Sequence, residues 1–216
     1  MMAAFAGGGG GGGGCPYEQN GLVFWLDGKV GASATEWVEQ IGGMVFANNG
    51  CLLLPDGYSF DGSNYLRSND SFAYTGENLT IEAVFETAAS HNTVYYVFSY
   101  LGSAKGNPCL LFNEQYSLAE YTQGTVAYSF KPDAAVKTSV SFSADNGLAN
   151  GNSLSKAFAD SNGANAEFEI GNAPSASRRF KGNIHCIRIY NRKLTQQEAL
   201  SNLAVDNARF NLGLNI

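Results

Sequence analysis

The sequence predicts an all-β protein, a two-sheet antiparallel jelly-roll sandwich with one short helix near the C-terminus. Short apolar segments recur about every dozen residues, separated by Gly, Asn, Asp and Pro. Several of these segments alternate between apolar and polar residues, as strands with one buried face do. Only the segment that begins at Thr195 has apolar residues at helical spacing.

Length and composition fit a single folded domain. The chain has 216 residues, of which 44% are hydrophobic and 15% charged, so it has ample material for a core and we expect no wholesale disorder. The formal net charge of -6 argues against nucleic acid as a partner. No apolar run approaches the roughly 20 residues of a membrane-spanning helix, so we expect no membrane partner.

The first strands are expected between residues 22 and 66. Leu22–Leu26 is a continuous apolar run that ends at Asp27, before a glycine, as a buried strand does before a turn. Tyr58–Phe60 and Tyr65–Leu66 flank a polar turn at 61–64. That arrangement is typical of a β-hairpin.

The segment at residues 79–86 alternates strictly, so both of its faces can be assigned. Four apolar side chains should face the core: Leu79, Ile81, Ala83 and Phe85. The remaining four should face outward: Thr80, Glu82, Val84 and Glu86. Further strands are expected at 93–101, 109–112, 125–130, 136–142, 166–170 and 183–190, with Tyr128 facing inward, Lys137, Ser139 and Ser141 outward, and Phe168 and Ile170 opposite Glu167 and Glu169.

The helix has a clear start. Thr195 and Glu198 form a capping-box pattern, in which each side chain bonds the other residue's backbone amide. Apolar residues at 199, 200, 203 and 204 then make a narrow stripe that should pack against the sandwich. From Asn207 to Ile216 we expect an extended tail.

Residues 1–14 differ from the rest in composition. Met1, Met2, Ala3, Ala4, Phe5 and Ala6 are followed by eight glycines, which resist ordering because of their backbone entropy. We therefore expect a flexible tether at 1–14, the β-sandwich at 15–210 and a tail at 211–216. The leader is either a plain linker or a tether whose Met1–Ala6 end anchors the protein in a larger assembly. Its apolar stretch is short and lacks a basic start, so we do not interpret it as a secretory signal.

The four cysteines, Cys15, Cys51, Cys109 and Cys186, lack the close spacing of a zinc site. In the absence of a secretory signal we expect reduced thiols. Cys109 and Cys186 lie in apolar strand-like runs, where they should behave as small buried hydrophobic residues.

Several segments resemble a known family. The runs Gly21–Asp27, Ala34–Trp37 and Tyr58–Leu66 are similar to the opening of a laminin G-like domain of the concanavalin A-like lectin/glucanase superfamily. Leu79–Glu82 resembles its next element, and Gly182–Thr195 its closing segment, which is the most specific part. The resemblance covers about residues 20–210 and implies a curved jelly roll that binds glycans or proteins through loops at its rim.

The C-terminal run Asn207–Phe210 resembles tails found in virion proteins of tailed phages and in surface proteins of gut bacteria. We therefore expect a multicopy adhesion module on a virion, as a capsid-decorating, head-fibre or tail-associated protein. Its partners would be host-surface or mucosal glycans, or a host-surface protein, together with a capsid or other virion protein bound through the tether. Two alternatives are a purely architectural virion subunit and a bacterial cell-surface lectin.

We expect no enzymatic activity. Glucanases of the superfamily carry Glu-x-Asp-x-Glu on one strand, but here Val84 stands between Glu82 and Glu86, which should be solvated outward glutamates. The pair Glu167 and Glu169 receives the same interpretation. Of the two histidines, His91 and His185, the second should be structural, with Cys186 on the opposite face of its strand, which leaves no dyad. A degenerate glycoside hydrolase is the remaining alternative.

Candidate binding residues are few. Tyr116 and Tyr121 lie in a polar stretch and are the tyrosines most suited to stacking on a sugar, whereas Tyr95 and Tyr128 suit the core. A basic cluster at 178–181 is expected to be a solvated loop. No cofactor is expected. A structural calcium stays open, because five aspartates lie beside turns: Asp27, Asp56, Asp61, Asp70 and Asp145.

Overall fold

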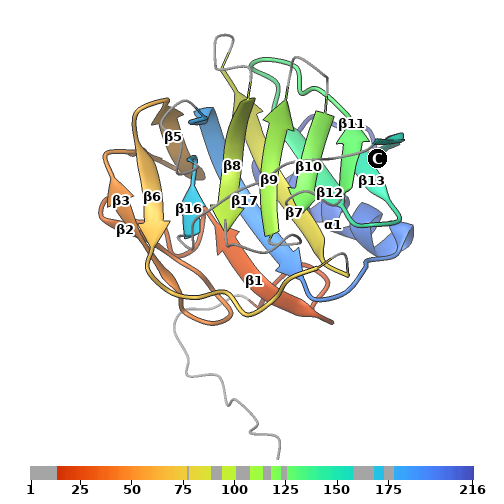
Figure 1. Ribbon diagram of the computed structural model, residues 1–216, viewed down its shortest axis with the longest axis horizontal. Helices are drawn as coiled ribbons and strands as arrows, with labels where there is room; N and C mark the ends of the chain where they lie inside the picture. Colours follow the sequence, from red (N-terminus) through yellow and green to blue (C-terminus); the bar gives the residue numbers. More distant parts are fainter. Residues whose placement is uncertain are drawn as a thin grey trace, which may run out of the picture.

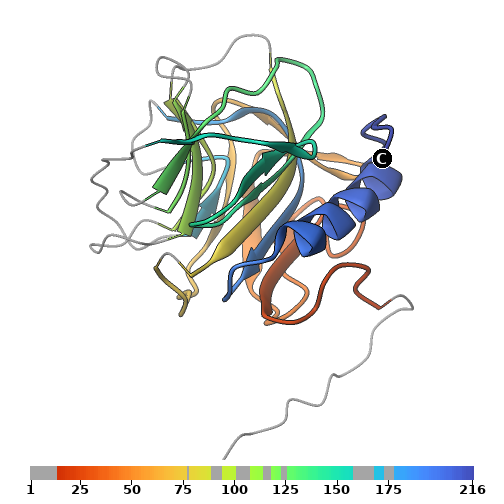
Figure 2. The same ribbon diagram turned by 90° about the vertical axis from the view of Figure 1, so that its right-hand side faces the viewer.

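The computed structural model describes residues 14–76, 78–88, 94–100, 108–113, 118–122, 126–157, 168–172 and 178–216. Within these ranges, two antiparallel sheets pack face to face, and one helix covers the outer face of one sheet (Figure 1). Figure 2 shows the layers from the side, with the helix next to the sheet that contains β7 and β17. The predicted two-sheet sandwich is confirmed.

The sheet beneath the helix has eight strands among the described residues. They run in the order β14-β13-β12-β7-β17-β5-β4, and β1 also pairs with β17. Their bounds are β1 Leu22–Asp27, β4 Leu52–Leu54, β5 Gly57–Asp61, β7 Thr80–Thr87, β12 Thr138–Phe142, β13 Gly147–Ala149, β14 Asn152–Ser153 and β17 Lys181–Tyr190.

The second sheet has nine described strands, in the order β15-β11-β10-β9-β8-β16-β6-β3-β2. Its outer face is turned toward the viewer in Figure 1. The bounds are β2 Glu36–Val38, β3 Val45–Asn49, β6 Tyr65–Ser68, β8 Val94–Tyr100, β9 Pro108–Asn113, β10 Leu118–Thr122, β11 Val126–Ser129, β15 Lys156–Ala157 and β16 Phe168–Ile170.

The core between the sheets is rich in aromatic side chains, as the alternating strands predict. Phe168 lies at its centre, with its ring centroid 5.2 Å from that of Phe24 and 5.1 Å from that of Phe46. The four inward residues predicted for β7 are all buried in this core. Tyr128 also points inward, and its hydroxyl donates to the Ser143 carbonyl.

Helix α1 spans Gln196–Phe210, and within the described ranges no helix has the length and apolar character of a membrane span. The capping box of Thr195 and Glu198 is present as predicted. The predicted tail from Asn207 is wrong, because the helix continues to Phe210, whose buried side chain holds the last turn against the sheet. Beyond the helix the chain folds back, and the Asn207 side chain exchanges hydrogen bonds of 2.8 and 3.0 Å with the backbone of Leu214.

A buried ion cluster joins the helix to the sheet. The Arg188 guanidinium on β17 makes two parallel hydrogen bonds to Asp206 of α1, at 2.7 and 2.8 Å, and its Nε donates to Glu82 of β7 at 2.8 Å. Asn202 of α1 donates to the same Glu82 oxygen at 2.8 Å. The ring of Tyr17 lies 3.8 Å from the guanidinium carbon. The segment before β1, strands β7 and β17, and the helix therefore all meet at Arg188.

The expectation that Glu82 is solvated is therefore wrong. Glu82 does point outward from the core, but α1 covers that face and leaves the residue 1% exposed. Burial raises the pKa of Glu82, although Arg188 opposes the shift. Burial alone would lower the pKa of Arg188, but the neighbouring Asp206, Cys186 and Glu82 raise it well above its ordinary value. Ser139, also expected to face outward, is buried here and donates to Asp206 at 2.8 Å.

Replacing Arg188 with Met should lower the free energy of unfolding by about 3–5 kcal/mol, because two buried carboxylates would lose their common cation. Urea denaturation measures the change. Lys181→Met, which removes an exposed cation from the same strand, should change stability by at most about 0.5 kcal/mol. A loss below about 1 kcal/mol in the Arg188 variant would contradict a structural role for the cluster.

A β-bulge on β17 changes the face on which His185 lies relative to Cys186. The strand's register against β7 shifts between Ile184 and Cys186. Because of the extra residue, His185 and Cys186 both turn toward the helix layer, where the His185 ring centroid lies 5.9 Å from that of Phe210. The prediction of opposite faces is therefore wrong. All four cysteines are free thiols, and Cys109 and Cys186 are buried as predicted.

His185 is buried and structural, in line with its predicted role. Its Nδ1 lies 3.1 Å from the Asp56 carbonyl oxygen and 3.2 Å from the Asp56 carboxylate. Lys137 contacts the same carboxylate at 3.3 Å and donates to the Phe210 carbonyl at 3.0 Å. Burial lowers the pKa of His185, Asp56 opposes the shift, and Lys137 adds to it.

This environment predicts a pH-dependent stability. As the pH falls, the unfolded chain takes up the His185 proton first, at its ordinary pKa of about 6.5. The stability from neutral His185 is fully present above that value and is lost as the pH falls through the lower folded pKa. The free energy of unfolding, measured by urea denaturation, should decrease more between about pH 7.5 and about pH 5.5 for the wild type than for His185→Gln. Equal losses would contradict this explanation.

Candidate functional site

A pocket of about 380 Å³ lies at the end of the sandwich where β6 ends. The turn between β2 and β3, the segment after β6 and the start of β1 enclose it. We call it the rim pocket and define it by Phe24, Glu39, Gly43, Asp70, Phe72 and Tyr74. It lies at the rim of the sandwich, where binding sites were expected.

Aromatic side chains connect the core to the surface of the pocket. The Phe72 ring centroid lies 5.9 Å from that of Phe24 in the core and 5.5 Å from that of Tyr74. Tyr74 is 38% exposed, whereas Phe72 is buried. An exposed tyrosine supported from below in this way offers an apolar face and a polar hydroxyl to one ligand.

Asp70 supplies the polar part of the rim pocket. The Ser68 hydroxyl lies 3.2 Å from both the Asp70 carboxylate oxygen Oδ2 and its backbone nitrogen, which fixes the side chain. Among the described residues, the other carboxylate oxygen has no hydrogen-bond partner. Asp70 is exposed, so this oxygen can accept a hydrogen bond from a hydroxyl group of a ligand.

Glu39 holds one wall of the pocket in place, and its carboxylate is occupied by backbone hydrogen bonds. Its buried carboxylate accepts four backbone amides, from Trp25 at 2.7 Å, Ile41 at 2.7 Å, Gly42 at 2.5 Å and Gly43 at 3.2 Å. The turn also needs glycine at position 43, where φ is 76°. The loop that forms one wall is therefore preorganised around a single acid.

Replacing Glu39 with Ala should leave several of these amides unsatisfied and reduce the free energy of unfolding by about 1–3 kcal/mol. Amide hydrogen exchange should also accelerate at residues 41–43, because those amides lose their acceptor. Glu36→Ala, which removes an exposed acid three residues earlier, is the control and should leave both readings near wild type. Unchanged exchange at 41–43 would show that Glu39 does not hold the wall.

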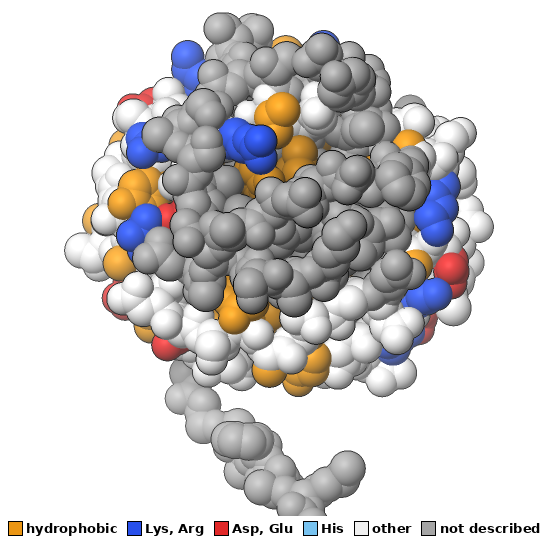
Figure 3. Space-filling view, in the orientation of Figure 1, with side chains coloured by type: hydrophobic (Ala, Val, Ile, Leu, Met, Phe, Trp, Pro, Cys, Tyr) orange, Lys and Arg blue, Asp and Glu red, His pale blue; other side chains and the backbone are white. Residues whose placement is uncertain are grey.

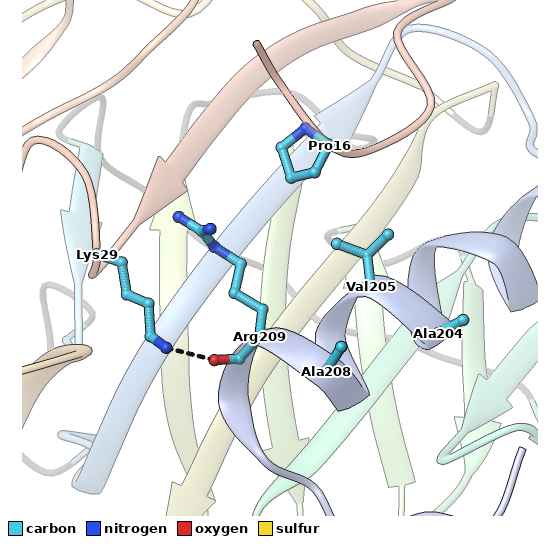
Figure 4. A pocket seen from close by; sticks show the side chains of 6 residues that line it. All are labelled: Pro16, Lys29, Ala204, Val205, Ala208 and Arg209. Atoms are coloured by element: carbon cyan, nitrogen blue, oxygen red, sulfur yellow. Dashed lines mark hydrogen bonds between the residues drawn. The ribbon is translucent and has the colours of Figure 1, made fainter. Parts of the chain in front are cut away.

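A larger cleft, of about 550 Å³, lies beside the helix. Figure 4 shows its lining by Pro16, Lys29, Ala204, Val205, Ala208 and Arg209. Both cations already have partners, since Lys29 Nζ donates to the Arg209 carbonyl at 2.5 Å and Arg209 Nε donates to Asp27 at 2.7 Å. The helix-side cleft therefore suits an apolar contact better than a sugar.

A polar cluster lies on the outer face of the nine-stranded sheet. There Glu169 of β16 is fully buried and forms an ion pair with Arg67 of β6. The prediction that Glu169 is solvated is therefore wrong: it points outward, but Arg67 and Asn172 enclose its carboxylate. Glu167 lies outside the described residues.

The predicted binding residues fall largely outside the described part of the chain. Tyr116 and the anchoring segment Met1–Ala6 lie outside it, as do His91 and all but Gly14 of the tether. Tyr121 belongs to β10, but its side chain is not described. These assignments stay predictions.

The five turn aspartates do not converge in the structure. Among the described residues, no group of three or more His, Cys, Asp or Glu side chains could hold a metal ion. Four of the five have partners of other kinds: Asp27 pairs with Arg209, Asp56 with Lys137, Asp145 with Lys193, and Asp61 caps the turn at Ser63. Asp70 instead lines the rim pocket.

No sequence pattern marks Tyr74 as a ligand-binding residue. Asp70, Phe72 and Tyr74 alternate shortly after β6, and nothing in that spacing indicates which strand they pack against. The contact between Phe72 and Phe24 joins residues far apart in the chain. Only the three-dimensional arrangement reveals the pocket.

The chain belongs to the concanavalin A-like lectin/glucanases superfamily, whose family model matches residues 60–199. No curated protein matches it in sequence. Among solved structures, Trypanosoma rangeli sialidase in complex with sialic acid is similar in fold, with 15% identity and a TM-score of 0.63 over 88% of this chain and 33% of that one. The botulinum neurotoxin serotype D ligand-binding domain in complex with N-acetylneuraminic acid has 13% identity and a TM-score of 0.62, over 88% of this chain and 52% of that one.

The prediction of no enzymatic activity is wrong, because the similar structures include a sialidase, which is an enzyme. The prediction rested on Val84, which removes the middle acid of one glucanase pattern on one strand. That argument does not apply to enzymes with other catalytic groups. This chain spans about a third of the sialidase, so the likeness concerns the fold alone.

Proposed function

We propose that the chain is a glycan-binding adhesion module that takes a sugar in the rim pocket. One observation carries the proposal: the exposed residues Asp70 and Tyr74 line one pocket, whose wall includes a loop held by Glu39. A pyranose has apolar C–H faces and a rim of hydroxyls. The ring and the carboxylate complement these two surfaces.

The fold supports the same proposal. The sialidase and the neurotoxin domain both have this sandwich in structures that contain sialic acid. A sugar in this chain would contact groups that need little rearrangement, because Phe72 and Glu39 are already packed or hydrogen-bonded. Preorganisation of this kind reduces the entropy lost on binding.

We further propose that the module is displayed in many copies on a virion and contacts host-surface or mucosal glycans. Met1–Ala6 would anchor it to a capsid or other virion protein through the glycine tether. Many weak sites acting together give strong adhesion. Mass spectrometry of purified virions should detect the chain in multiple copies per particle, and its absence from them would contradict this setting.

The helix-side cleft favours a second candidate, a purely architectural virion subunit. Pro16 lines this cleft close to where the leader joins the sandwich, and much of the remaining lining is apolar. In this case the helix side, and not the rim pocket, would make the important contact. A bacterial cell-surface lectin would use the same rim pocket in a different setting.

A glycan array probed with the purified full chain tests the proposed sugar site. Tyr74→Ala should weaken binding about tenfold, because the stacking surface is lost. Asp70→Asn should weaken it by a smaller factor, since an amide keeps one acceptor. Leu52→Ala is the control. It truncates an exposed apolar side chain on β4, which does not line the pocket, and the variant should bind as wild type. Wild-type binding by the Tyr74 variant, or no binding by the wild type, would contradict the proposal.

A further inference from the structure

A row of polar side chains crosses the outer face of the nine-stranded sheet. Strand pairing places Arg67 of β6 opposite Glu169 of β16, and Glu169 opposite Ser99 of β8. Side chains directly opposite one another on paired strands point to the same face. The three therefore form one row across the outside of the sandwich.

This row fixes the Glu169 carboxylate completely. Arg67 Nε donates to Glu169 at 2.9 Å, and Asn172 Nδ2 donates to its other oxygen at 2.9 Å. The Ser99 hydroxyl donates to the Asn172 carbonyl at 2.9 Å, which holds Asn172 in position. The buried negative charge and the Arg67 cation neutralise each other.

A second guanidinium, that of Arg179, shares a tyrosine ring with Arg67. The Tyr65 ring centroid is 5.0 Å from the guanidinium carbon of Arg67 and 5.8 Å from that of Arg179. Arg179 also donates to the Ser63 carbonyl. Both guanidinium groups therefore contact the same tyrosine ring, and we call Tyr65, Arg67, Glu169 and Arg179 the arginine–tyrosine cluster.

Arg179 differs from Arg67 in having no counterion among the described residues. Its Nε is shielded from solvent and finds no hydrogen-bond acceptor in the described structure. Arg178 and Lys181 are exposed close by in the chain and add positive charge. In Figure 3, Lys and Arg side chains show on the left of this face, the side of β6 and β16 in Figure 1. A protein with a net charge of -6 therefore has a local excess of positive charge here.

From this geometry we infer that the arginine–tyrosine cluster binds the carboxylate of an acidic sugar, with Arg179 as the binding group. A guanidinium offers paired N–H donors that match the two oxygens of a carboxylate. The inference rests on the proposed glycan-binding function and names an acidic ligand class at a separate place on the molecule.

A single carboxylate fits better than a polyanion. Glu169 lies in the cluster, and the exposed Asp61 lies at the end of β5, where the turn to Tyr65 of β6 begins. The net charge of the whole chain would repel a long anionic polymer. The cluster has one uncompensated guanidinium, which matches one negative charge.

The test is isothermal titration of the full chain with N-acetylneuraminic acid, glucuronic acid and neutral N-acetylglucosamine. Arg179→Gln should weaken binding of the acidic sugars about tenfold or more, because a charge-assisted bidentate contact is lost. Arg178→Gln removes the same charge from the neighbouring exposed position and should stay within about twofold of wild type. Binding of N-acetylglucosamine should not change in either variant.

Arg179→Lys separates charge from geometry, and it serves as the second variant if Arg179→Gln does not fold. It keeps the cation but loses the paired donors, so we expect a loss close to that of the Gln variant. Binding of both acids would assign the site to carboxylate sugars in general, and binding of one acid would narrow it to that sugar. Either result supports the inference if it depends on Arg179.

Three outcomes would overturn the inference: no binding of either acid by the wild type, wild-type affinity in Arg179→Gln, or equal losses in the Arg178 and Arg179 variants. Equal losses in the two variants would indicate that the acidic sugar is attracted by positive charge in general and not bound by Arg179. Tyr74-dependent binding of neutral glycans would survive any of these outcomes. Failure of the acidic site is therefore distinguishable from failure of the proposed function.

Discussion

The Arg188 guanidinium holds the helix layer against the sandwich. It joins Asp206 of α1 to Glu82 of β7, and Tyr17 covers it from the segment before β1. Burying a charged group costs desolvation free energy unless its partners are in place. The cluster therefore favours the one position of the helix in which all of its ion pairs form. Because α1 covers the outer face of the eight-stranded sheet, the two proposed binding sites lie elsewhere, at the rim and on the nine-stranded sheet.

The two binding features differ in how they are supported. The rim pocket depends on a buried acid, Glu39, which organises a loop beneath an exposed ring, Tyr74. The arginine–tyrosine cluster depends on a buried pair, Arg67 and Glu169, which leaves the neighbouring Arg179 without a counterion among the described residues. In both, a neutralised or fully hydrogen-bonded acid supports the group that would contact the ligand.

Alternation and capping were sufficient to predict the sandwich, the inward face of β7 and the start of α1, because these features depend on neighbours in sequence. The same patterns could not show that Glu82 and Glu169 are buried. Their cover comes from Asp206 and Arg188 in one case and from Arg67 in the other, which are distant in the chain. The bulge at His185 escaped prediction for a related reason, since it depends on the register against β7. Tyr74 became a candidate only once Phe72 was seen to pack on Phe24.

Locating a bound glycan on the molecule tests the two proposed binding sites most directly. An NMR titration of the ¹⁵N-labelled full chain with sialyllactose, which combines neutral sugars with one carboxylate sugar, reports on every assigned amide. We expect shifts at residues 42–43 and 70–74 of the rim pocket and at 178–181 in and beside the arginine–tyrosine cluster. Shifts confined to residues 204–209 of the helix-side cleft, or no shifts at saturating sugar, would contradict this expectation.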